Sequence, residues 1–349
     1  MRFGRYFGAK AAGEVQFGVS MSSLPVAREI EVLDLRHFSA RQLRPLLERE
    51  ADVWRDRLRW DYRSSTELLL QYLESRILNG FVALDQGRIC GYTFCVYEGH
   101  KAVIGDAFAS GHRSMTDADA TRVLLEHALE MLRHSPAVDR VESQLLLFDA
   151  GEFADIFDGP EFTLYPRLFL ECDLRSSPAV EGVPAEIPSE LELSQWTAHD
   201  YQAAGELIYT SYVGHADAKI NDQYRSLHGS LRFLHNIVRF PGCGIFEANF
   251  SWMLRDKLTG ALVGMILCSR VAPDVAHVTQ LCIAKAYRGR GLGRALLAQS
   301  ARTLLESGFE ALSLTVTESN TQAVKLYGGF GFLPRHRFDA MAFDTHYRR

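Results

Sequence analysis

The sequence lacks the long apolar run that a membrane-spanning helix requires. Its longest strongly apolar stretch, residues 261–268, is interrupted by Gly264, whereas a spanning helix needs about 18 or more such residues. The beginning of the chain also has no continuous apolar core, so we expect no secretory signal. We interpret residues 1–28 as a flexible tail, and translation could equally begin at Met21.

Cysteine pairs with the spacing of a metal or redox site are absent as well. None of the six cysteines forms a CxxC pair, and most lie in apolar, strand-like stretches. This distribution favours buried free thiols over a disulfide framework or a zinc site. We therefore expect no bound metal and a reducing, cytoplasmic location.

Neither sign of charge is in large excess. The 349 residues include 38 Lys+Arg and 43 Asp+Glu, a formal net charge of −5 at pH 7, which predicts no nucleic-acid or anionic-membrane partner. Hydrophobic residues make up 47% of the chain and charged residues 23%, which excludes a wholly disordered protein. The length favours two domains, each large enough to bury a core.

Proline is sparse except in one segment. Three of the 11 prolines fall within residues 176–190, where they block helix formation and strand pairing. The segment therefore predicts a linker between two domains, residues 29–175 and residues 191–349.

The predicted elements follow the same order in both domains. The second domain has expected helices at 197–213, 230–238, 291–305 and 321–327, and expected strands at 251–255, 261–271, 276–284, 311–317 and 336–343. The first has expected helices at 64–78, beginning with a Ser64/Glu67 capping box, and 117–133, and expected strands at 81–84, 89–96, 102–109 and 141–147. Corresponding elements lie about 170 residues apart, which favours duplication of one mixed α/β unit over two unrelated α+β domains.

A glycine-rich turn follows one predicted strand of the second domain and opens an amphipathic helix. The stretch reads LCIAKAYRGRGLGR over residues 281–294. Free backbone N–H groups and the positive end of the helix dipole make such a turn suitable for a diphosphate. Gly291 and Gly293 let the backbone approach the phosphates, and three arginines add positive charge: Arg288, Arg290 and Arg294.

The glycine pattern distinguishes among phosphate ligands. The dinucleotide fingerprint GxGxxG fails because its third glycine is missing, and the phosphate-loop pattern GxxxxGK[ST] is absent. The pattern that fits is Arg-x-x-Gly-x-Gly at Arg288, Gly291 and Gly293, and it resembles the coenzyme A diphosphate loop of the GNAT N-acetyltransferase superfamily. Residues 318–332, ESNTQAVKLYGGFGF, are similar to the second half of that family's signature.

This resemblance covers the second domain and implies a mixed α/β sheet in each of two tandem GNAT-like acetyltransferase domains, with acetyl-CoA as cosubstrate. Backbone groups of Leu281, Cys282 and Ile283 would pair with the pantetheine arm, and Asn320 would lie beside it. The residues whose backbone amides would hold the diphosphate are Arg288, Gly289, Arg290, Gly291, Leu292, Gly293 and Arg294. Tyr327 would direct its hydroxyl at the thioester sulfur.

The implied reaction is direct attack of an amine on the acetyl carbonyl. A backbone N–H at the end of the strand would stabilise the oxyanion, and Tyr327 would protonate the departing thiolate. The alternative for Tyr327 is an ordinary core aromatic. Relatives that acetylate the N-terminal alanine of a ribosomal protein have a Glu where this chain has Thr315, so that general base is missing.

The general base is therefore left open. Glu318, Glu247, Asp274 and His277 are candidates, each also explained as a solvated or structural residue, and a water relay is a further possibility. Two segments could border the acceptor site or simply pack. Residues 54–62 mix aromatic and charged residues, which favours a packed loop with a solvated charged face over an acceptor pocket. Residues 209–217 fall where the first helices of this fold border the acceptor site, and ordinary helix packing is their alternative.

The corresponding turn of the first domain, residues 109–117, has no Arg-x-x-Gly-x-Gly pattern. Thr116, Asp117 and Asp119 suit a helix N-terminus, but these carboxylates would repel a diphosphate. We therefore expect a degenerate first domain that does not bind coenzyme A and that supports the active domain or walls its acceptor cleft.

The sequence thus predicts an N-acetyltransferase that acts on a small-molecule or peptide amine. A non-catalytic acyl-CoA-binding or regulatory protein on the same fold is the alternative, kept open by Thr315. Neither the acceptor nor the oligomeric state can be read from the sequence.

Overall fold

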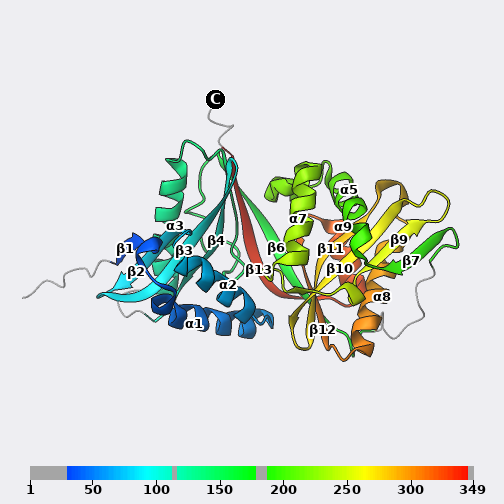
Figure 1. Ribbon diagram of the computed structural model, residues 1–349, viewed down its shortest axis with the longest axis horizontal. Coiled ribbons are helices and arrows are strands. Elements are labelled where there is room, and N and C mark those ends of the chain that lie inside the picture. Colours follow the sequence, from blue (N-terminus) through cyan, green and yellow to red (C-terminus); the bar gives the residue numbers. More distant parts are fainter. Residues whose placement is uncertain (1–29, 112–115, 178–186, 345–349) are drawn as a thin grey trace, which may run out of the picture.

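The computed structural model describes residues 30–111, 116–177 and 187–344. The predicted N-terminal tail and most of the predicted linker lie outside these ranges. The described strands form one 13-stranded mixed sheet that runs through two lobes, with β6 and β13 between them (Figure 1). The mixed α/β fold class predicted from the sequence is confirmed.

The first lobe is built from three helices and six strands of the first half of the chain. They are β1 (Glu31–Asp34), α1 (Ala40–Leu58), α2 (Arg63–Glu74), β2 (Asn79–Asp85), β3 (Arg88–Glu98), β4 (Lys101–Ala109), α3 (Asp117–Arg133), β5 (Arg140–Gln144) and β6 (Phe162–Asp173). In this lobe α3 covers one face of the sheet, and α1 and α2 cover the other (Figure 1).

The second lobe repeats this plan. Its elements are β7 (Leu191–Gln195), α5 (Tyr201–Tyr212), α6 (Asp217–Ile220), α7 (Leu227–Arg239), β8 (Ile245–Phe246), β9 (Trp252–Asp256), β10 (Leu262–Ala272), β11 (Val275–Ile283), α8 (Leu292–Glu306), β12 (Ala311–Thr317), α9 (Thr321–Phe330) and β13 (Leu333–Asp344). Strands β3 and β10 both have 11 residues, and β4 and β11 both have 9. The repeated element order predicted from the sequence is therefore present in the structure.

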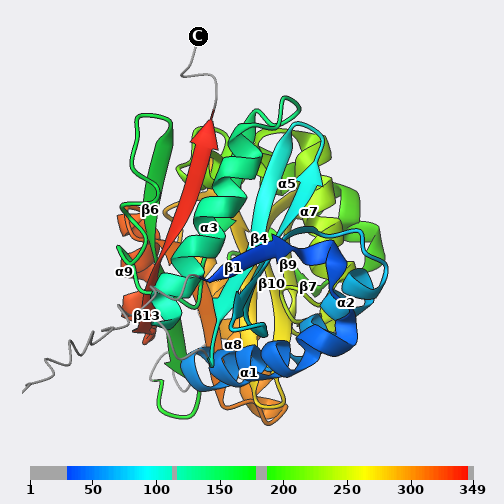
Figure 2. The same cartoon turned by 90° about the vertical axis from the view of Figure 1, so that its left-hand side faces the viewer.

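The two lobes exchange one strand each. The strand order runs β1-β2-β3-β4-β5-β13-β6-β12-β11-β10-β9-β7. Strand β6 of the first half of the chain pairs with β12 of the second, and β13 returns to pair with β5 and β6; Figure 2 shows β6 and β13 side by side. The proposed domains at residues 29–175 and 191–349 thus share strands, and their boundaries remain a prediction.

Two local predictions for the first half are wrong. The helix expected to begin with a Ser64/Glu67 capping box begins at Arg63 after Tyr62, which makes no side-chain cap, so Ser64 lies inside the helix, which ends at Glu74. Residues 54–58 belong to α1 rather than to a loop. The packing of Trp54 on Tyr62, with ring centroids 4.4 Å apart, links the end of α1 to the start of α2.

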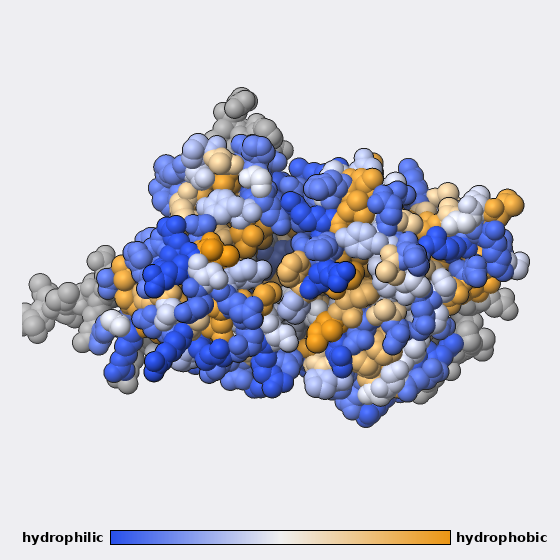
Figure 3. All heavy atoms as spheres, in the orientation of Figure 1, coloured by the Kyte–Doolittle hydropathy of each residue, from blue (hydrophilic) through white to orange (hydrophobic). Residues whose placement is uncertain are grey.

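An apolar core joins the lobes. Trp54 and Trp60 from the first half pack in one cluster with Val275 of β11 and Phe338 of β13. On the face shown in Figure 3 the surface is hollowed between the lobes and bordered by hydrophilic residues. All six cysteines are free, and five of them are buried, with Cys243 exposed.

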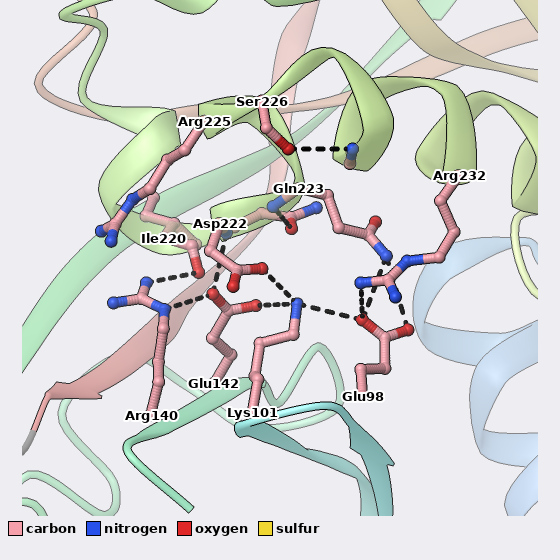
Figure 4. A network of polar contacts seen from close by, with 12 residues as sticks. Glu98, Lys101, Arg140, Glu142, Ile220, Asp222, Gln223, Arg225, Ser226 and Arg232 are labelled. Atoms are coloured by element: carbon pink, nitrogen blue, oxygen red, sulfur yellow. Dashed lines mark hydrogen bonds and ion pairs between the residues drawn. The ribbon is translucent and has the colours of Figure 1, made fainter.

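A buried ionic network also ties the α6–α7 segment of the second lobe to the first (Figure 4). The side chain of Lys101 is only 4% exposed, and its Nζ lies 3.2 Å from Glu98, 3.1 Å from Glu142 and 2.5 Å from Asp222. Arg140 pairs with Glu142 at 2.6 Å. Because Asp222 follows α6 directly, the network fixes the position of that helix.

Substitution of Lys101 tests how much this network contributes to the stability of the protein. In Lys101→Met three carboxylates lose their shared cation, so we expect the free energy of unfolding to fall by about 3–5 kcal/mol. Arg44→Met is the control, because the Arg44–Glu67 pair is exposed and should contribute less than about 1 kcal/mol. Urea unfolding at one pH compares the two variants, and equal losses would contradict the assignment.

Candidate active site

The site begins where two parallel strands separate. Strands β11 and β12 pair from Val275 with Ala311 to Val278 with Leu314 and no further, although both strands continue. At that point Thr279 is an extra residue on β11, because its neighbours pair with consecutive residues of β10. Such a β-bulge bends its strand, and here it turns β11 away from β12.

The fork leaves strand edges without a neighbouring strand. Beyond Val278, β11 remains paired only with β10, and beyond Leu314, β12 remains paired only with β6. A free strand edge of this kind can pair with an extended ligand through its backbone groups.

A cavity of about 450 Å³ follows the fork. It brings together nearly all the residues expected from the sequence, namely Leu281, Cys282, Ile283, Arg288, Gly289, Gly291, Leu292, Gly293, Arg294, Asn320 and Tyr327. Among the expected residues, Arg290 does not line it. The cavity thus joins the glycine-rich turn to the segment with Asn320 and Tyr327.

The turn depends on glycine for its backbone conformation. Gly289 has φ +77° and Gly291 has φ +76°, and a Cβ at either position would meet no atom within 4 Å. The requirement is therefore conformational rather than steric. Helix α8 begins directly after Gly291, so its first N–H groups have no intrahelical partner and lie beside the cavity.

The arginines of the turn already have protein partners. Arg288 donates from Nε to the Ile283 carbonyl and from Nη2 to the Ser211 carbonyl, both at 3.0 Å, which fixes the end of β11 to α5. Arg294 donates to the Gly329 carbonyl at 2.9 Å. Arg290 pairs with Glu190. Backbone amides are therefore the better-placed donors for an anion at this turn.

Tyr327 lies on α9 and lines the cavity. Its side chain is buried, and burial, together with the nearby Cys282 and Asp217, raises the pKa of its hydroxyl above the ordinary value. The hydroxyl has no hydrogen-bond partner among the residues that the structure describes. The cavity at the fork is therefore lined by a protonated phenol whose hydroxyl is available to a ligand.

Another wall of the cavity comes from the end of α5 and from α6. Asn320 caps α9 by accepting from the Ala323 N–H at 3.2 Å, and its Nδ2 lies 3.2 Å from Nε2 of His215. Asp217 accepts from the Thr317 hydroxyl at 2.6 Å. His215 and Asp217 line the cavity, and Asp217 is the one carboxylate among its described lining residues.

Within residues 209–217, the structure thus separates site residues from packing residues: Ser211, Tyr212, His215 and Asp217 line the cavity, whereas Tyr209 and Thr210 do not. Thr279, Gln280 and Gln322 also line the cavity, although they were not predicted as site residues. No local pattern marks these residues, because the bulge and the helix positions that expose them are tertiary features.

None of the four general-base candidates lines the cavity. Three are ion-paired with arginines: Glu318 with Arg337 at 2.8 Å, Glu247 with Arg270 at 2.9 Å and Asp274 with Arg59 at 2.7 Å. His277 is buried, with its ring 5.0 Å from that of Trp60. Burial lowers the pKa of His277 to about 3, so it is neutral at physiological pH.

The first lobe has a comparable fork with different contents. Strands β4 and β5 pair from Lys101 to Ile104 and then separate. Just beyond lies Asp106, which is buried beside Glu50, and burial raises the pKa of both carboxyls. Glu50 accepts from the Tyr92 hydroxyl at 2.6 Å. Side chains thus occupy the position that is a cavity in the second lobe.

Helix α3 of the first lobe begins with acidic residues. Its N-cap Thr116 accepts from the Asp119 N–H, and Asp117 and Asp119 lie in the first turn, as the sequence predicts. The preceding residues 112–115 lie outside the described part of the chain. The absence of coenzyme A binding in this lobe remains a prediction.

Among the residues that the structure describes, no cluster of three or more His, Cys, Asp or Glu side chains is arranged to hold a metal ion. No helix among the described segments has the length and apolar character needed to cross a membrane.

Comparison with known proteins gives a consistent result. A model of the acetyltransferase (GNAT) family matches residues 220–332. N-alpha-acetyltransferase MAK3 of Arabidopsis thaliana is 33% identical over 141 residues, which are 38% of this chain and 70% of that protein.

Two solved structures share the fold of both lobes. A tandem GNAT protein from the clavulanic acid biosynthesis pathway has a TM-score of 0.59 and 16% identity, covering 91% of this chain and 99% of its own. A GCN5-related N-acetyltransferase from Sphaerobacter thermophilus has a TM-score of 0.61 and 15% identity, covering 93% and 97%.

The buried His277 predicts a pH dependence of stability. Its pKa in the folded state, about 3, lies below the ordinary histidine value of 6.5, so the unfolded chain binds a proton that the folded protein excludes. This residue should therefore lower the free energy of unfolding as the pH falls below 6.5, by about 2 kcal/mol between pH 7 and 5.

The measurement is urea unfolding across that pH range for the wild type and His277→Gln. The variant should lack this part of the pH dependence, whereas other titrating groups act equally on both proteins. Parallel curves of unfolding free energy against pH for the two proteins would show that His277 does not cause this pH dependence.

Proposed function

Because this chain belongs to the GNAT acetyltransferase family, we propose that its second lobe transfers the acetyl group of acetyl-CoA to a primary amine. The observation that carries the proposal is the single cavity in which the strand fork, the glycine-rich turn and the buried Tyr327 meet. The relative from Arabidopsis is named an N-alpha-acetyltransferase, so an α-amino group is the first acceptor that we propose.

Acetyl-CoA fits the cavity from two sides. The free edge of β11 at Leu281, Cys282 and Ile283 offers backbone groups to the amides of the pantetheine arm. The amides around Gly291 and the start of α8 offer N–H donors to the diphosphate. Asn320 lines the same cavity.

The protein then acts on three charges that change during transfer. A backbone N–H at the fork donates to the oxygen of the acetyl carbonyl as the amine nitrogen attacks its carbon. Asp217 accepts the proton that the new ammonium loses, directly or through water. Tyr327 donates its proton to the sulfur as the carbon–sulfur bond breaks.

The first lobe has a supporting role in this proposal. Its fork is filled by Glu50 and Asp106, and its contribution is to hold the α6–α7 segment through the Lys101 network. The free, mostly buried thiols support a reducing, cytoplasmic location.

Blocking the turn should abolish acetyl-CoA binding. Gly291→Glu places a side chain and a negative charge at the proposed diphosphate site, so we expect calorimetric titration to show a loss of at least about a hundredfold in affinity.

Gly87→Glu is the matched control for this titration. Gly87 also has φ +76° and no atom within 4 Å of its Cβ position, and it lies in the β2–β3 turn, far from the cavity along the chain. Both variants acquire the same backbone strain and charge. Equal loss of binding in both, or none in Gly291→Glu, would remove the assigned diphosphate site.

Removing the hydroxyl of Tyr327 should slow the chemical step. In Tyr327→Phe we expect unchanged acetyl-CoA affinity and a fall in kcat of about a hundredfold or more, because the thiolate leaves without a proton donor. Release of the free thiol of coenzyme A measures the rate.

Tyr209→Phe is the comparison, because this tyrosine lies on α5 away from the cavity lining. It should keep the wild-type rate. Unchanged kcat in Tyr327→Phe would refute the general-acid role and favour a binding protein without this chemistry.

A further inference from the structure

Arg167 is a buried cation next to the cavity. It lies on β6 and is only 9% exposed. It is paired with Thr317 of β12 on one side and with Phe338 of β13 on the other. Paired residues of neighbouring strands present their side chains on the same face, so Arg167 shares a face with Thr317 and Thr315.

The partners of the Arg167 guanidinium are all neutral. Nη1 donates to the Gln144 side-chain oxygen at 3.0 Å, and Nη2 donates to the Thr315 hydroxyl at 3.4 Å. Its buried Nε has no hydrogen-bond partner. In the described part of the chain no carboxylate forms an ion pair with it, which leaves a charge in the interior without a counterion.

This arrangement differs from that of the other buried cations. Lys101 has three carboxylates around it, and Arg140 pairs with Glu142. A buried charge without a partner destabilises a folded protein. A guanidinium kept in that state is suited to a counterion that arrives from outside.

The guanidinium borders the cavity through its hydrogen bond to Thr315 and is not itself among the lining residues. Thr315, which receives its hydrogen bond, lines the cavity, and Gln144 on its other side is exposed. Asp217 accepts a hydrogen bond from the hydroxyl of Thr317, the residue that is paired with Arg167 across β12 and β6. A positive and a negative group therefore face the same small region.

We propose that Arg167 binds a carboxylate carried by the acceptor amine, so that the acceptor class is amines with a carboxylate near the reacting nitrogen. This inference rests on the proposed acetyl transfer. The guanidinium offers parallel N–H donors to the carboxylate, while Asp217 lies at the end where the ammonium group would sit. Both a free amino acid and a peptide with an acidic first residue carry this chemistry.

Paired acceptors test the inference. Free amino acids are compared with their carboxamides, and dipeptide amides that begin with aspartate or glutamate are compared with those that begin with asparagine or glutamine. Wild-type kcat/KM should favour the carboxylate about ten- to a hundredfold in at least one pair, mainly through KM. The pair that shows the preference identifies the source of the carboxylate.

Three variants accompany the assay. Arg167→Met should reduce the preference to less than about threefold, while the carboxamide acceptors keep their rates. Arg167→Lys keeps the charge and should retain part of the preference. Arg133→Met is the control, because Arg133 also has a buried Nε without a partner but already pairs with Glu161 in the first lobe.

Thermal unfolding separates this role from a structural one. Removal of an uncompensated buried charge should leave the Tm of Arg167→Met unchanged or raise it, whereas loss of a structural arginine would lower it. The inference is overturned if no wild-type pair shows a preference, if the preference survives in Arg167→Met, or if a wild type that binds acetyl-CoA acetylates neither member of any pair. Loss of acetyl-CoA binding itself would instead overturn the proposed function.

Discussion

The pairing of β6 with β13 is the interaction on which the rest of the structure depends. It joins two half-sheets into one sheet, because β6 also pairs with β12 and β13 also pairs with β5. The lobes cannot turn against each other without breaking this ladder. The pairing of β6 with β12 on its other edge brings Arg167, from the first half of the chain, to the strand that forms one arm of the fork.

The two buried cations at the contact between the lobes, Lys101 and Arg167, differ in their partners. Lys101 and its three carboxylates form a compensated cluster that fixes α6 and α7. Arg167 is nearly as buried, but its partners among the described residues are neutral. The first arrangement serves the architecture. The second carries an electrostatic cost, which we assign to recognition of an acceptor.

Local features were predictable from the sequence, and long-range features were not. The glycine-rich turn and the bounds of α3 and β12 follow from patterns within a few residues, whereas Tyr327 was implied by the resemblance to the family signature. The long helix α1 was not predicted, although its apolar residues follow helical spacing; Pro45 inside it is the local feature that argues against a helix. The strand exchange, the bulge at Thr279 and the placement of Asp217 and Arg167 depend on pairing between segments far apart in the sequence, which no local pattern encodes.

The strand exchange also determines the order in which the strands can pair while the protein is being synthesised. Strand β6 ends at Asp173, but both of its neighbours, β12 and β13, leave the ribosome only after most of the second half has been made. Until then both edges of β6 are unpaired and β5 has one open edge. Such edges recruit other chains, and non-local pairing of this kind forms slowly. In a nascent chain the strands at the centre of the sheet, β5 and β6, therefore need protection from pairing with other chains for longer than the outer strands do.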